Sequence, residues 1–194
     1  MEVEFLNPAK RHGRRRWLLT VWLCLSVSTV QIYAPAPSGV DEYRAKAAFL
    51  YNVCKFVSWP ESAMPPKDRP FVIGVVGNHP LMSVFARELA GKSIGGRKIE
   101  VRSFARLRDG HAARALYCDV NQLRELTRSS RSRLARGGVL TVGDGSECLP
   151  VGSVLALGIR DGRLAFEVNV GAARRAGLEM DANLLGLAAK VVDE

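Results

Sequence analysis

Residues 153–170 read SVLALGIRDGRLAFEVNV, the clearest local signal in the chain. Two apolar runs, 153–160 and 163–170, flank Asp161-Gly162, the pair favoured in a two-residue type I′ hairpin turn. Such a loop pairs Arg160 with Arg163, and strand alternation then puts every second side chain on one face. That face carries Ile159, Leu164, Leu157, Phe166, Leu155 and Val168. The stretch therefore predicts a β-hairpin that buries one side.

The other side of this hairpin and the turn after it supply the candidate binding residues. Glu167 and Asn169 stand among Ala156 and Ala165 on that other face. They form either a solvated face, or a set that satisfies the loops and helix end behind them or contacts a partner. Arg174-Arg175 follow, either as basic residues of a surface turn or as a clamp for a carboxylate or phosphate. Glu167, Asn169, Arg174 and Arg175 are thus candidates for partner or ligand binding.

Outward from the hairpin, hydrophobic periodicity predicts alternating strands and helices. A helix at 41–57 has two apolar stripes and stops before Trp59-Pro60. A last helix at 181–192 begins at a capping Asp181 and has a stripe of Leu184, Leu187, Ala188 and Val191. The elements between are strands at 71–77, 98–104, 115–118 and 139–142, and helices at 81–89 and 122–134. The pattern predicts a single α/β domain over 41–194, with a mixed β-sheet and a C-terminal β-hairpin covered by helices.

The first 36 residues have the order of a signal peptide. Basic residues at Lys10-Arg11 and 14–16 precede an apolar run over 17–30, which leads to small residues at Ala34 and Ala36. The run is shorter than the roughly 20 residues that a bilayer-spanning helix needs. Pro35 and Pro37 obstruct the cut, so its position and a retained anchor stay open. We expect an exported, periplasmic protein.

The net charge of +9 is spread rather than concentrated. Residues 1–36 hold five basic and two acidic residues, a net +3, which leaves +6 for the rest. The body has neither a long basic run nor aromatic residues interleaved with one. This pattern argues against nucleic acid as a partner.

Cys54, Cys118 and Cys148 remain after removal of the signal. An odd number allows at most one intrachain disulfide. Cys54 lies in a helix expected to be buried, which leaves Cys118 and Cys148 as the candidate disulfide or redox pair.

The sequence offers little chemistry for a catalytic site. The carboxylates near Cys148 oppose activation of its thiol. Gly74, Gly77 and His79 stand at a strand-to-helix turn but lack the full glycine fingerprint of a nucleotide site. The spacings of cysteine and histidine suit no zinc site. We therefore expect no catalytic, cofactor-binding or metal site, and a hydrolase centred on Cys148 or His79 remains a minor alternative.

Several motifs together resemble the YfiR family of exported bacterial proteins, in order and over essentially everything after the signal. They are Lys46-Ala47-Ala48-Phe49-Leu50-Tyr51-Asn52, Lys55-Phe56-Val57, Trp59-Pro60, residues 71–77, Gly95-Gly96-Arg97, residues 139–144, Phe166-Glu167-Val168-Asn169, and residues 176–178 before Leu184-Leu185.

The resemblance implies a periplasmic regulator without enzymatic activity. Such a protein binds and represses the periplasmic sensor region of an inner-membrane diguanylate cyclase, and so lowers cyclic di-GMP and biofilm growth. It also implies a homodimer, sequestration by an outer-membrane lipoprotein, and stabilising or redox-responsive disulfides. This chain departs from that pattern, because three body cysteines cannot form two intrachain bonds. The alternatives are a regulator of another sensor, such as a histidine kinase, and a periplasmic small-molecule-binding protein with a pocket served by Arg174 or Arg175.

Overall fold

A computed structural model describes residues 39–77 and 81–194. The predicted signal peptide at 1–36 and His79 lie outside the described residues. Within the described ranges, no helix is both long and apolar enough to cross a membrane.

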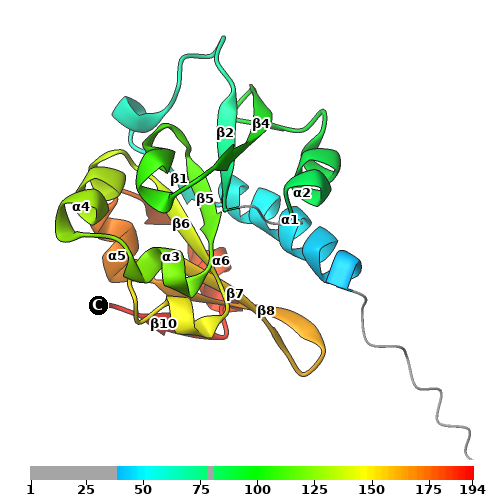
Figure 1. Ribbon diagram of the computed structural model, residues 1–194, viewed down its shortest axis with the longest axis vertical. Helices are drawn as coiled ribbons and strands as arrows, with labels where there is room; N and C mark the ends of the chain where they lie inside the picture. The colour runs from blue at the N-terminus through cyan, green and yellow to red at the C-terminus, as the bar shows by residue number, and fades with distance from the viewer. Residues whose placement is uncertain (1–38, 78–80) are drawn as a thin grey trace, which may run out of the picture. The chain divides into compact units, whose positions relative to one another are not determined.

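Eight of the strands in the described ranges form one mixed sheet (Figure 1), in the order β10-β8-β7-β6-β5-β2-β4-β3. Five neighbouring strands, from β7 to β4, pair in parallel, and their order is the flavodoxin-like 2-1-3-4-5. The hairpin β7–β8 continues this core, and β10 and β3 form the edges. The bounds are β2 Phe71–Val76, β3 Ser93–Ile94, β4 Arg97–Phe104, β5 Ala115–Cys118, β6 Leu140–Asp144, β7 Leu155–Arg160, β8 Arg163–Asn169 and β10 Lys190–Val192. A separate ladder pairs β1 (Val57–Ser58) with β9 (Glu179–Met180).

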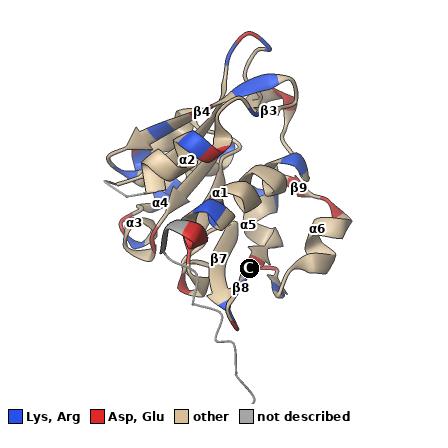
Figure 2. Cartoon of the chain, turned by 90° about the vertical axis from the view of Figure 1, so that its right-hand side faces the viewer, with Lys and Arg blue, Asp and Glu red and all other residues tan. Residues whose placement is uncertain are grey.

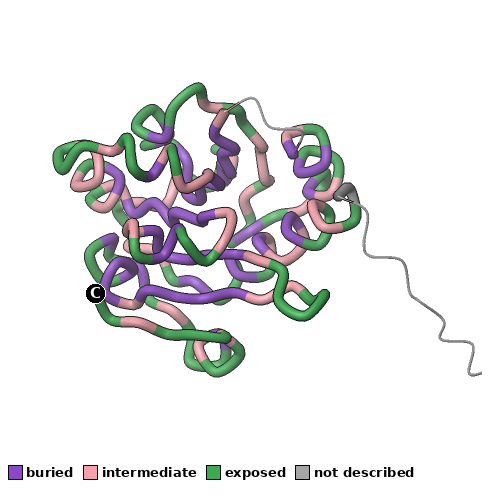
Figure 3. Tube along the Cα trace, turned by 60° about the horizontal axis from the view of Figure 1, so that its bottom comes forward, coloured by how far each residue is buried: buried purple, intermediate pink, exposed green. Residues whose placement is uncertain are grey.

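The predicted hairpin is confirmed residue by residue. Arg160 pairs with Arg163 across the turn, and all the apolar pairs expected from the two-residue loop follow in register. Asp161 and Gly162 have φ values of 51° and 72°, the positive pair that a type I′ turn requires. Toward the turn, both strands change from buried to exposed (Figure 3). The base of the hairpin therefore belongs to the core and its tip projects into solvent.

The helices cover both faces of the sheet. Two clusters of buried side chains result, one with α1 and α2 and the other with α3 and α4. The bounds are α1 Gly39–Lys55, α2 Leu81–Leu89, α3 Val120–Arg124, α4 Arg128–Arg136, α5 Val170–Arg175 and α6 Ala182–Leu187, with short 3₁₀ turns at Glu61–Ala63, Leu107–Ala112 and Ser146–Cys148. The predicted mixed α/β fold is confirmed.

Helix α1 confirms the prediction at 41–57, with one correction. The stripe of Ala47, Leu50 and Cys54 is fully buried against the sheet. The second predicted stripe is only partly covered, because Ala45 is exposed and Phe56, beyond the end of the helix, is 46% exposed. The helix therefore buries one side fully and the other side only in part.

The helix predicted at 122–134 is two helices. Thr127 separates α3 from α4, and its hydroxyl accepts a hydrogen bond from the Ser130 backbone N–H at 3.2 Å. A threonine side chain at this position satisfies a free N–H of a new helix start. Residues 127–133 are all polar, so the apolar pattern gave no information about the break, and the cap at Thr127 was overlooked.

The last predicted helix, 181–192, is wrong in its second half. Asp181 does cap α6, because its carboxylate accepts from the Asn183 N–H at 2.8 Å. The helix then stops at Leu187, and β10 pairs in parallel with β8. The predicted apolar stripe is mostly exposed, since Leu187 is 76% and Val191 45% exposed. Residues 190–192 instead form backbone hydrogen bonds with the open edge of β8.

Candidate functional site

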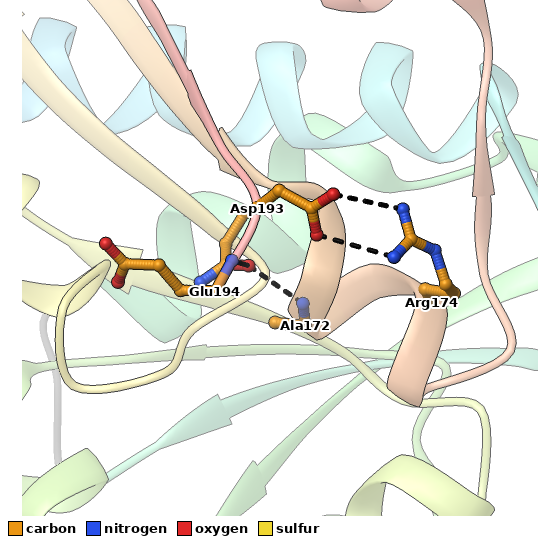
Figure 4. Close-up of polar contacts among 5 residues, drawn as sticks. Ala172, Arg174, Asp193 and Glu194 are labelled. Carbon is orange, nitrogen blue, oxygen red and sulfur yellow. Dashed lines mark hydrogen bonds and ion pairs between the residues drawn. The ribbon is translucent and has the colours of Figure 1, made fainter.

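Asn169 ends β8 and begins α5, a helix that hydrophobic periodicity did not indicate. Its side-chain oxygen accepts hydrogen bonds from the Ala172 N–H at 2.8 Å and the Glu194 N–H at 3.4 Å (Figure 4). The Asn169 side chain and Ala172 are both buried, so the Ala172 N–H would otherwise lack a hydrogen-bond partner. Of the two readings of the sequence, the structure supports the one in which Asn169 satisfies the helix end behind it.

Glu167 lies on the same face and is also buried. Its carboxylate accepts a hydrogen bond from the Arg160 guanidinium at 2.9 Å, across the two strands of the hairpin. The Glu167 side chain is 10% exposed whereas that of Arg160 is 55% exposed. The pair therefore neutralises an enclosed carboxylate with a cation that remains in contact with water.

The two candidate arginines of α5 differ in their surroundings. Arg174 forms a two-pronged contact with the carboxylate of Asp193, at 3.4 and 3.2 Å (Figure 4). This exposed pair fastens the chain after β10 onto α5. Arg175 is also exposed, has no ion pair among the described residues, and lies at the rim of a cavity. Only Arg175 is left for a ligand, and binding by any of the four candidates stays a prediction.

The three described cysteines are free thiols that lie on two sides of the sheet. Cys54 belongs to the cluster under α1, and Cys118 and Cys148 belong to the opposite cluster. Cys118 pairs with Gly143 across β5 and β6, and a Cβ at Gly143 would overlap Cys148. Cys148 therefore occupies the space above Gly143, beside Cys118. The sheet separates Cys54 from both.

Burial makes all three thiols poor nucleophiles. It raises the pKa of Cys54 and Cys118 well above the usual range. Burial, and after it the carboxylates of Glu147 and Asp144, raise the pKa of Cys148 to about 12. Since the thiolate is the reactive form, none of the three resembles an activated cysteine.

A buried lysine ties α1 to the carboxyl end of β6. Lys46 Nζ lies 2.6 Å from Asp144 Oδ1 and 2.5 Å from Glu42 Oε1, and its side chain is 4% exposed. Burial alone lowers the pKa of Lys46, but hydrogen bonds to Asp144 and then Glu42 outweigh it and raise that pKa. The paired carboxylates thus keep a charged ammonium inside the domain.

The sequence reasoning missed this cluster. Its signal was available, because Lys46 stands four residues before Leu50 and so falls on the buried side of the helix. Tyr117 adjoins the same cluster, and burial followed by the charge of Asp144 raises the pKa of its phenol. The cluster lies where the parallel strands end, the edge at which open α/β sheets bind ligands. In this protein, however, the charged groups of the cluster form ion pairs with one another.

Other predicted features have ordinary surroundings. Gly77 has a φ of 83°, as the predicted tight turn after β2 requires. Within the described ranges no three side chains of His, Cys, Asp or Glu form a group able to hold a metal ion. Lys and Arg residues are scattered over several elements and interleaved with acidic ones in the view of Figure 2.

Strand order and contacts together define an α/β domain with a flavodoxin-like parallel core, extended by an antiparallel hairpin and an edge strand. The model of the YfiR/HmsC-like family matches residues 43–189. The chain belongs to this family, and the resemblance seen in the sequence motifs is confirmed.

Solved structures give a more distant comparison. A conserved domain protein from Vibrio cholerae O1 biovar eltor str. N16961 shares 13% identity with a TM-score of 0.49, covering 77% of this chain and 60% of that one. The ABC domain in complex with L-Trp from Streptococcus pneumonia shares 10% identity with a TM-score of 0.41, covering 62% and 55%. This chain thus spans less than two thirds of either structure. No curated protein matches the sequence.

Proposed function

We propose that this chain is a periplasmic signalling regulator that binds and represses the periplasmic sensor region of an inner-membrane diguanylate cyclase. The observation that carries the proposal is the family match over residues 43–189. This range contains every strand of the sheet except the edge strand β10. The order of basic and apolar residues in 1–36 supports export.

A regulator of this kind acts through a surface, and the projecting hairpin offers one. A hollow of about 240 Å³ lies on its outer face, with Ala156, Gly158 and Ala165 among the lining residues. Ile159 also lines the hollow and is 42% exposed, and the charged residues Glu147, Arg160 and Glu167 belong to the lining as well. Small residues that leave a hollow beside an exposed apolar side chain suit insertion of a partner's side chain. We assign the sensor region as the occupant of this hollow.

Deletion and complementation test the function. Deletion of the coding sequence in the source bacterium should raise cellular cyclic di-GMP, and the full-length chain should restore it. An unchanged cyclic di-GMP level in the deletion strain would contradict the proposed repression. A change in the output of a histidine kinase instead would identify a histidine kinase as the sensor that this chain regulates.

Two glycine variants test the docking surface. A Cβ at Gly158 or at Gly186 meets nothing within 4 Å, and neither residue has a positive φ, so both tolerate a side chain. Gly158→Phe fills the hollow, whereas Gly186→Phe places the same side chain on α6. We expect Gly158→Phe to lose repression of cyclic di-GMP with its thermal midpoint retained, and Gly186→Phe to repress normally. Repression retained by Gly158→Phe, or lost equally in both variants, would refute docking at the hairpin.

A further inference from the structure

A second and larger cavity lies away from the hairpin hollow, between α4 and α5 and beside the beginning of β6. Its volume is about 390 Å³, which falls within the range of small-ligand pockets. Residues of both α4 and α5 line it, and Figure 1 shows the two helices next to each other at one end of the sheet. The inner lining is mainly apolar and includes Leu123, Leu134, Val139 and Val154. Such a lining favours the apolar part of a ligand.

The polar part of the lining has one sign of charge. Three arginines line the cavity, Arg131, Arg136 and Arg175, and no Asp or Glu does. Arg131 is engaged in the fold, since it donates hydrogen bonds to the carbonyl oxygens of Leu123 and Val151. Arg136 and Arg175 are exposed and have no ion pair within the described part of the chain. Two guanidinium groups therefore remain available to a ligand.

Helix ends give a simpler reason for these arginines. Arg136 and Arg175 stand in the last turns of α4 and α5, where a cation interacts favourably with the helix dipole. However, Arg133 and Arg174 stand in the same last turns and do not line the cavity. The chain thus contains a matched arginine for each of the two, and the dipole and ligand explanations can be separated by experiment.

We propose that this cavity binds a small organic anion with an apolar body, whose anionic group is held by Arg136 and Arg175. The apolar lining contacts the body of the ligand and excludes water from it. The two exposed guanidinium groups then contact the anionic group of the ligand. Arginine suits this role because its planar donors form paired hydrogen bonds with a carboxylate, sulfonate or phosphate. The site is distinct from the hairpin hollow and is independent of the proposed signalling partner.

Two fluorescent probes with the same aromatic body test the class of ligand. The anion is 8-anilinonaphthalene-1-sulfonate, and N-phenyl-1-naphthylamine is the uncharged counterpart without the sulfonate. Both are titrated into the purified protein at constant ionic strength, with octanoate and octanol as competitors. We expect saturable binding of the anionic probe, weaker binding of the neutral probe, and displacement by octanoate rather than octanol. Equal affinity for the two probes would overturn the assignment of an anion site.

Arginine variants then locate the site. Arg136→Gln and Arg175→Gln should each lower the affinity for the anionic probe about tenfold, the usual effect of losing a charge-assisted hydrogen bond. Arg133→Gln and Arg174→Gln remove the same charge from the same helices and should leave its affinity unchanged. An equal loss in all four variants would show attraction to the net positive charge only, and would refute the site.

A cavity-filling variant guards against adsorption elsewhere. Ala135 lines the cavity and is only partly buried, so Ala135→Phe reduces the free volume from the rim. We expect Ala135→Phe to abolish saturable binding of the anionic probe while near-ultraviolet circular dichroism keeps its folded signal. Undiminished binding in a folded Ala135→Phe variant would place the probe on another apolar surface and overturn the proposal.

Discussion

The helix α1 and the C-terminal segment 181–192 show the same hydrophobic period in the sequence, but they have different structures. Helix α1 fully buries Ala47, Leu50 and Cys54 and is fastened by the ion pairs of Lys46. The C-terminal segment buries Leu184, leaves Leu187 76% exposed, and changes from helix to edge strand. A helical period therefore predicts a helix reliably only where the domain provides a surface that covers the apolar stripe.

The largest expected difference between these two regions is thiol accessibility. Cys54 in α1 should react with an alkylating reagent about a thousandfold more slowly than a cysteine introduced by Leu187→Cys. A core thiol reacts only through an opening that costs several kcal/mol, whereas an exposed one reacts directly. Mass spectrometry of timed alkylation measures both rates. Rapid labelling of Cys54 in the native protein would show that α1 is not core.

The other two thiols extend this test. During refolding with oxidised glutathione, Cys118 and Cys148 should lose two hydrogens and form one intrachain disulfide, while two molecules of glutathione are released. Cys54 should remain a free thiol, since the sheet lies between it and the pair. Peptide mapping of alkylated, non-reduced protein identifies the bond. A disulfide that includes Cys54 would contradict the arrangement of the two clusters.

Truncation of one leucine in each region tests burial directly. Leu50→Ala should destabilise the protein by about 2–5 kcal/mol, because it removes a fully buried side chain and leaves a cavity. Leu187→Ala should change the free energy of unfolding by less than about 0.5 kcal/mol, since its side chain is already in water. Urea unfolding of the two variants measures both values. Equal losses would mean that the Leu187 side chain is buried to the same extent as the Leu50 side chain.

Loss of the buried ammonium should have a smaller effect. Lys46→Met should cost about 1–3 kcal/mol, less than for a fully enclosed pair because the side chains of Asp144 and Glu42 are 28% and 30% exposed. Lys55→Met, at the exposed end of the same helix, should stay within about 0.5 kcal/mol.

This effect should also depend on pH. The pKa of Lys46 is higher in the folded than in the unfolded state. Its contribution is therefore complete below the unfolded value of about 10.4 and disappears as the pH rises through the folded value. Urea midpoints of the wild type and Lys46→Met should differ near pH 8 and converge at strongly alkaline pH. A gap that stays constant would contradict an ionic contribution.

The turn of the hairpin tests β8, the strand on which β10 depends. Gly162→Val should cost about 1 kcal/mol or more, because Gly162 has a positive φ that a β-branched residue adopts only with strain. Gly158→Val, in ordinary strand conformation and open space, is the matched control and should melt near the wild-type temperature. Identical melting of both variants would place the turn elsewhere.

The smallest effect should come from the contact after β10. Arg174→Gln removes an ion pair in which both side chains are more than half exposed, so stability should change by less than about 0.5 kcal/mol. Arg160→Gln should cost more, about 1 kcal/mol, since it leaves the enclosed Glu167 carboxylate unpaired. Thermal midpoints measure the two changes. A larger loss in Arg174→Gln would show that the C-terminal segment is fixed more firmly than its exposure indicates.

The hairpin and the strands of the parallel core could be predicted from local sequence patterns. A two-residue loop leaves one register for the adjoining strands, so every pair from Arg160–Arg163 to Leu155–Val168 could be derived from Asp161-Gly162. Short apolar runs bounded by turn residues likewise indicated β2, β5 and β6, and the turn pair Gly95-Gly96 indicated β4 after it. These are local signals, in which the deciding residues are neighbours in the chain.

Which side chains come into contact depends on how distant parts of the chain pack together. Lys46 and Asp144 are 98 residues apart, and Cys118 meets Cys148 only because β5 and β6 pair. Segment 190–192 became a strand because β8 left an open edge beside it. No local pattern encodes such contacts, because each depends on strand order and on hydrogen-bonding groups that another part of the chain leaves free.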